Sequence, residues 1–137
     1  MLVRSLLAAI GLLHLASGLW MLLAPEHWYA TVPGVIATGP FNPHFITDIA
    51  LAFGLSGIGL MLGARRGTTP GAFAVAGAAW PAAHGLFHLW EWLTDGVPQD
   101  PMAATTALIG VMLPGLAGAV LAWMRSRQDH ITGTAIP

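Results

Sequence analysis

Residues 45–64 read FITDIALAFGLSGIGLMLGA, a run of twenty residues with one charge, Asp48, near its start. A helix rises about 1.5 Å per residue and the hydrocarbon core of a bilayer is about 30 Å thick, so this run is typical of a transmembrane helix. Three further apolar windows surround it, over residues 2–24, 71–93 and 102–124. The sequence therefore predicts an all-α bundle of four transmembrane helices.

The composition agrees with this fold class. Of the 137 residues, 55% are hydrophobic and 8% are charged, whereas about 25% are charged in an ordinary soluble domain. A water-soluble globule is thereby excluded. The net charge is -1 and there is no basic run, which argues against nucleic acid as a partner. Cysteine is absent, which excludes disulfides and thiolate metal sites.

Arginine placement predicts the orientation, because short loops rich in Lys and Arg stay on the cytoplasmic side. All five arginines fall on one side of the predicted bundle: Arg4, Arg65, Arg66, Arg125 and Arg127. We therefore expect both termini in the cytoplasm and a multi-pass domain over residues 1–127 in a bacterial inner membrane. Residues 128–137 are expected to form a disordered tail. As an alternative, residues 1–24 could be read as a signal peptide.

Several residues suggest how the helices begin and pack. We expect Asn42 to cap the second helix, with Pro43 in its first position. Pro81 and Pro114 lie inside predicted spans and favour local kinks. Gly59 and Gly63 form a GxxxG pair. Such pairs serve tight packing within one bundle or, as an alternative, a face for a homo-oligomer or a larger membrane complex.

Ionisable side chains inside a membrane are costly, and each one is therefore a functional candidate. His14 lies in the first span, and His44 and Asp48 open the second. The third span carries His84, His88 and Glu91 in its outer half. Within each helix these residues are three or four positions apart and so share a face. Because the second and third spans are antiparallel, we expect the two sets to meet near the outer, periplasmic face.

Imidazole and carboxylate groups in this pattern predict a transition-metal site for Zn, Fe, Mn or Cu. The predicted ligands are His44, Asp48, His84, His88 and Glu91, with His14 closing the site. Asp48 or Glu91 would act as a catalytic base beside metal-bound water. Met21 and Met102 would add soft ligands for Cu(I). The metal site would serve redox chemistry, hydrolysis or metal handling. Whether the protein is an enzyme is left open.

Two alternative functions use the same residues. A b-type haem bundle would take His14 and His84 as axial ligands. A non-enzymatic accessory protein or small-solute transporter would use the histidines as a proton relay. Structural interpretations also exist: His14 could be a packed residue bonded to a backbone carbonyl, and His88 with Glu91 could be a solvated helix end.

The stretches LLAPEHWY (residues 22–29) and IALAFGLSGIGLMLGARR (residues 49–66), joined by a loop rich in Pro and Gly, resemble the DoxX-like families of small bacterial membrane proteins. The resemblance implies a four-helix fold. Some relatives in that group are linked to redox or respiratory complexes, which favours electron transfer. The stretches FNPHFITD and HGLFHLWEW do not match a signature of that group, so the resemblance implies no functional residue.

Overall fold

The computed structural model describes residues 1–67 and 70–133, in which all regular structure is helical and no β-strand occurs. Its four long helices are α1 (Leu2–Leu23), α3 (Pro43–Gly63), α4 (Pro70–Thr94) and α6 (Leu113–Gly133). The first three coincide with predicted apolar windows, whereas the fourth window, residues 102–124, covers the two short elements before α6 and its first half. Two short helices, α2 (Pro25–Thr31) and η1 (Val35–Thr38), lie between α1 and α3. Two more, α5 (Pro101–Thr105) and the π-helical η2 (Thr106–Met112), lead directly into α6.

Local sequence explains where the helices begin. The Asn42 side chain accepts a hydrogen bond from the Phe45 N–H at 3.1 Å, and Pro43 occupies the first position of α3. Asp100 caps α5 in the same manner by accepting from the Met102 N–H, with Pro101 next in sequence. Proline is harmless there because the first N–H groups of a helix have no partner within it. The predicted cap at Asn42 is confirmed.

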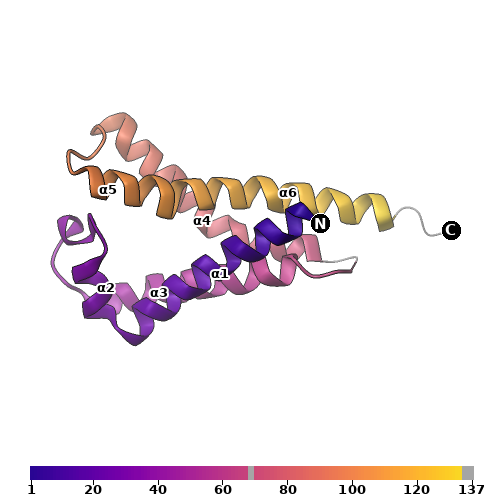
Figure 1. Cartoon of the computed structure of the whole chain (residues 1–137), viewed down its shortest axis with the longest axis horizontal. Coiled ribbons are helices and arrows are strands. Elements are labelled where there is room, and N and C mark those ends of the chain that lie inside the picture. Colours follow the sequence, from indigo (N-terminus) through magenta and orange to yellow (C-terminus); the bar gives the residue numbers. More distant parts are fainter. Residues whose placement is uncertain (68–69, 134–137) are drawn as a thin grey trace.

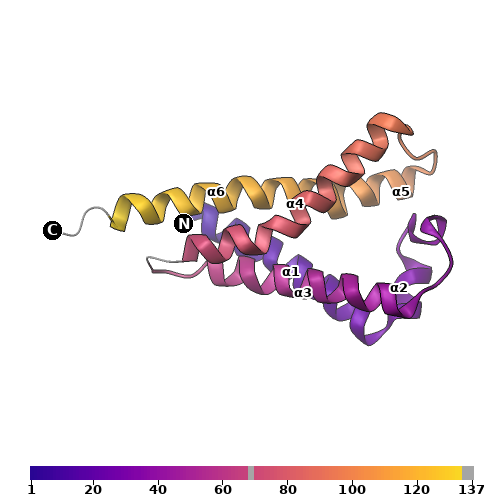
Figure 2. The same ribbon diagram turned by 180° about the vertical axis from the view of Figure 1, so that it is seen from behind.

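The long helices pack in the order α1, α3, α4, α6, with additional contacts between α1 and α6 and between α4 and η2. Figures 1 and 2 show that these helices lie close together at the end that holds the N-terminus. Toward the opposite end α4 leaves α3 and follows α5, so that α1 and α3 separate from α4 and α5. The bundle is therefore closed at one end and spread at the other.

Three helices are long and apolar enough to cross a membrane: α1, α3 and the continuous helix over Pro101–Asp129. Their outward faces carry large apolar side chains that suit contact with lipid, among them Leu12, Leu51, Leu55, Ile58, Leu113 and Val120. The protein is therefore a membrane protein with transmembrane helices. Helix α4 has 25 residues but is not among these three, and it is the helix that carries His84, His88 and Glu91.

The apolar core lies in two clusters. The larger one joins the four long helices near the closed end and consists of Leu7, Leu60, Ala74, Ala78 and Ala122, all at most 3% exposed. The smaller one, at the other end of α1 and α3, consists of Met21, Ile46 and Ala50, with the rings of Trp28 and Tyr29 packed against it. The closed end is thus filled by small and aliphatic side chains.

Glycine allows the backbones to approach at the contacts between neighbouring helices. A Cβ on Gly57 of α3 would lie 2.6 Å from the Leu15 N atom of α1. A Cβ on Gly77 of α4 would lie 2.5 Å from the Leu60 N atom of α3. Real Cβ atoms essentially never come this close to backbone. In this protein, small residues therefore permit the close helix packing that membrane bundles require.

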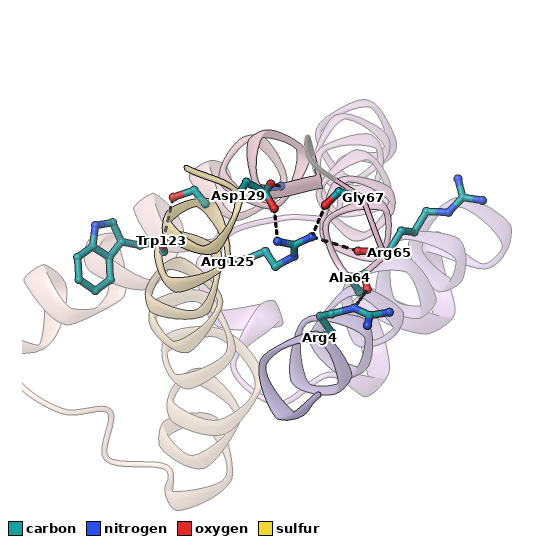
Figure 3. A network of polar contacts seen from close by, with 9 residues as sticks. Arg4, Ala64, Arg65, Gly67, Trp123, Arg125 and Asp129 are labelled. Carbon is teal, nitrogen blue, oxygen red and sulfur yellow. Dashed lines mark hydrogen bonds and ion pairs between the residues drawn. The ribbon is translucent and has the colours of Figure 1, made fainter. Parts of the chain in front are cut away.

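Helix α6 extends beyond its predicted end. Residues 128–133, expected in a disordered tail, are helical, whereas residues 134–137 lie outside the described residues. The buried Arg125 pairs with Asp129 one turn later and donates hydrogen bonds to the carbonyls of Arg65 and Gly67 (Figure 3). Asp129 in turn accepts from the Gly71 N–H at 2.7 Å. These bonds tie α6 to the loop between α3 and α4 and favour the additional helical turns.

We predict that Gly57→Ala destabilises the protein and that Gly54→Ala does not. The methyl group at position 57 would overlap the backbone of α1, whereas a Cβ at position 54 has no neighbour within 4 Å. Overpacking of this kind costs about 1–3 kcal/mol, while alanine in place of an unconstrained helical glycine gains up to about 1 kcal/mol. Thermal unfolding of both variants in detergent measures the difference. Equal loss of stability in the two would contradict the packing described here.

Candidate functional site

His14 is the deepest of the predicted site residues. It lies on α1, its side chain is 2% exposed, and its Nδ1 atom lies 2.9 Å from the carbonyl oxygen of Ile10. A carbonyl oxygen only accepts, so Nδ1 carries the proton and, in the neutral ring, Nε2 is the acceptor nitrogen. The bond to Ile10 therefore fixes the ring and presents an unprotonated nitrogen.

Phe53 of α3 connects His14 to the residues of α4. Its ring centroid lies 5.4 Å from that of His14, 4.9 Å from that of Trp80 and 6.2 Å from that of His84. Trp80 and His84 are four residues apart on α4, and their rings stack with centroids 4.8 Å apart and an interplanar angle of 13°. Two aromatic side chains thus hold the His84 ring in a defined orientation.

The chain of contacts continues along α4 toward the spread end of the bundle. The rings of His84 and His88 meet edge to face with centroids 4.8 Å apart. His88 Nδ1 lies 3.1 Å from Glu91 Oε2, and the two side chains are 25% and 41% exposed. We call His14, His84, His88 and Glu91 the histidine row. It runs from the interior of the bundle to a partly exposed carboxylate.

The histidine row leaves imidazole nitrogens available. Among the described residues, no hydrogen bond of His84 to protein is present, and the Nδ1 atom of His88 faces Glu91. His14 likewise uses only Nδ1. At least one nitrogen of each ring is therefore left for water, an ion or a bound molecule.

His44 and Asp48 form a separate pair on the first turns of α3. His44 Nε2 lies 3.6 Å from Asp48 Oδ2, and the two side chains are 88% and 60% exposed. Antiparallel packing led us to expect this pair beside His88, but α4 turns away from α3 at this end of the bundle (Figure 2). The predicted ligand set is therefore divided into a pair on α3 and a row on α4.

This division bears on metal binding. Within the described ranges no group of three or more His, Cys, Asp or Glu residues lies close enough to hold a metal ion. The five predicted ligands are therefore not gathered around one point. The two predicted catalytic carboxylates are separated as well, because Asp48 pairs with His44 and Glu91 pairs with His88.

The two methionines considered as soft ligands have other surroundings. Met21 is 1% exposed and packs in the cluster with Ile46 and Ala50. Met102 lies on α5 and is 62% exposed. Neither has a described contact with the histidine row.

Sequence reasoning missed Phe53 and Trp80 as members of the site. Trp80 precedes His84 by four residues, so helical periodicity places it on the same face and could have identified it. Phe53 has no such signal, because its role depends on the distance between α3 and α4.

Comparisons of the chain with protein-family models, curated proteins and solved structures found no match.

We predict that the two carboxylates act on different histidines. In ¹⁵N-histidine NMR spectra of the protein in micelles, Glu91→Gln should shift the side-chain resonances of His88 and leave those of His44 in place. Asp48→Asn should do the reverse, because each amide replaces a carboxylate that contacts one imidazole. If Asp48→Asn also shifts His88, the two groups form one site and the separation described here is wrong.

Proposed function

We propose that this protein is a four-span integral membrane protein whose histidine row binds a transition-metal ion near the outer face. The fourth span in this proposal is α4. Its 25 residues give a length of about 37 Å, which exceeds the thickness of about 30 Å of the hydrocarbon core. It packs between α3 and α6, and both α3 and the continuous helix over Pro101–Asp129 that contains most of α6 have the length and composition of transmembrane helices, which supports the assignment.

The arginines support an orientation with both termini in the cytoplasm of a bacterial-type inner membrane. Arg4 lies at the start of α1, Arg65 and Arg66 follow α3, and Arg125 and Arg127 lie near the end of α6. Four long helices that alternate in direction bring these positions to one end of the bundle. By the rule that Lys and Arg remain inside, the spread end with the histidine row then faces the periplasm.

The observation that carries the metal proposal is the ordered pair His84 and His88. Two histidines four residues apart on a helix present both rings on one face, as in known metal-binding helices. Glu91 Oε2 lies 3.1 Å from His88 Nδ1, and the second ring nitrogen of a metal-bound histidine commonly faces a carboxylate, a backbone carbonyl or water. Zn, Fe, Mn and Cu are the ions suited to imidazole ligands.

The arrangement supports a site with few protein ligands. His84 and His88 would hold the ion through nitrogens not used for protein hydrogen bonds, and water or a bound molecule would fill the other positions. Glu91 would orient His88. The larger set that includes His44 and Asp48 is not part of this proposal, because the described residues place that pair on a separate, exposed face.

Two observations favour a metal ion over the alternatives. A haem between His14 and His84 would need the space of the Phe53 ring, which contacts both imidazoles. A proton relay across the membrane would need a continuous series of polar groups from His14 to the buried Arg125–Asp129 pair at the closed end, and the core cluster at that end consists of Leu7, Leu60 and three alanines. The histidine row thus ends inside the bundle, as expected of a binding site that opens on one side.

Metal content tests the proposal directly. We expect the purified wild-type protein, after reconstitution with Zn, Fe, Mn or Cu, to hold near-stoichiometric metal by elemental analysis. His84→Ala/His88→Ala should lose it. His27→Ala is the matched control, because the exposed His27 accepts a hydrogen bond from Trp20, has no contact with the histidine row among the described residues, and should keep the metal. Circular dichroism verifies that each variant is folded.

Three results would contradict the metal proposal. They are unchanged metal in the His84→Ala/His88→Ala variant, no metal in the reconstituted wild type, and a Soret band in its absorption spectrum. The last result would indicate haem instead.

Reporter fusions test the fourth span and the orientation. Alkaline phosphatase, which is active only outside the cytoplasm, should be inactive when fused after Arg66 and active when fused after Asp95. These fusion points flank α4. Equal activities at the two points would show that α4 does not cross the membrane, and the reverse pattern would place the histidine row on the cytoplasmic side.

A further inference from the structure

We propose that a pocket at the arginine-rich end of the bundle binds the phosphate group of an anionic membrane lipid. The pocket has a volume of about 260 Å³ and lies between the start of α1 and the residues that follow α3. Its lining residues are Met1, Arg4, Ser5, Ala8, Ala64 and Arg66. The inference rests on the proposed insertion and orientation of the helices and is independent of the metal site.

Arg4 is held so that its terminal nitrogens are available. Its Nε atom donates a hydrogen bond to the Ala64 carbonyl oxygen at 2.7 Å, which joins α1 to the end of α3. In Figure 3 the two terminal nitrogens of Arg4 extend beyond this bond, and no further hydrogen bond or ion pair of Arg4 is present among the described residues. A guanidinium fixed on one edge presents its other N–H groups as a fork, which matches phosphate oxygens.

The charge of the pocket is not balanced by protein. Arg66 is exposed at its rim, and no carboxylate is among the lining residues. Asp129 lies at this end of the bundle and already pairs with the buried Arg125. Within the described ranges neither Arg4 nor Arg66 has a carboxylate partner. Two guanidinium groups therefore face one small space without a counter-charge.

Size and position point to a lipid headgroup. At about 260 Å³ the pocket is smaller than the usual 300–1,000 Å³ of sites for drug-sized ligands, so it suits one small anionic group. Ala8 and Ala64 give it an apolar wall on the side of the transmembrane helices. In the proposed orientation the arginine-rich end lies at the cytoplasmic leaflet, which presents anionic headgroups.

The test compares lipid binding to the full chain and to two charge-matched variants by native mass spectrometry in detergent. The probes are phosphatidylglycerol, zwitterionic phosphatidylcholine and inorganic phosphate. Arg66→Gln removes a pocket residue. Arg127→Gln removes the same charge at the same end but outside the pocket, since Arg127 lies 5.2 Å over the Trp123 ring. Circular dichroism verifies folding.

We expect phosphatidylglycerol to bind the wild type more tightly than phosphatidylcholine does. Arg66→Gln should raise its Kd about five-fold, the effect of about one surface charge, while Arg127→Gln should bind as the wild type does. Equal weakening in both variants would show diffuse attraction and overturn the pocket. Displacement of the lipid by millimolar inorganic phosphate would overturn the lipid as the source of the phosphate group.

Discussion

Close backbone contact at glycine is the constraint on which the rest of this bundle depends. Lipid provides no hydrophobic force between helices, so packing and hydrogen bonds must hold them together. Gly57 meets the backbone of α1, and Gly77 meets that of α3, with no room for a side chain at either contact. These contacts place α3 between its two neighbours. The cluster of Leu7, Leu60, Ala74, Ala78 and Ala122 fills the space between the helices at the closed end.

The same packing explains why the histidines of α4 lie toward the other end. Where α4 leaves α3, the helices no longer exclude larger side chains, and His84, His88 and Glu91 occupy this half of α4. His14 is a packed residue bonded to the backbone carbonyl of Ile10, which agrees with the structural interpretation of this histidine. The stacking of Trp80 on His84 and the pairing of His88 with Glu91 add an ordered set of imidazoles that simple packing does not require.

The sequence predicted the helices better than it predicted the site. Windows of apolar residues located the starts of α1, α3 and α4 within two residues, and the Asn42 cap followed from local chemistry. The fourth window begins one residue after the start of the continuous helix over Pro101–Asp129, not at the start of α6. The end of α6 was missed because it depends on Asp129 binding the distant Gly71 N–H. The meeting of His44 with His88 was expected from antiparallel order alone, whereas their separation arises from the course of α4 relative to α3. The DoxX-like resemblance stays a prediction.

The pairing of helices also bears on how the chain assembles during synthesis. The packing partner of α1 is chiefly α3, the next long helix along the chain, and that of α4 is chiefly α6. Each pair is an antiparallel hairpin of consecutive long helices, and such local contacts form quickly because little chain must be ordered to close them. The first hairpin contains the glycine contacts of Gly11, Gly18 and Gly57 and can close while α4 is still being synthesised. The two hairpins then join through α3 and α4, which makes docking of α4 the step that completes both the core and the row of histidines.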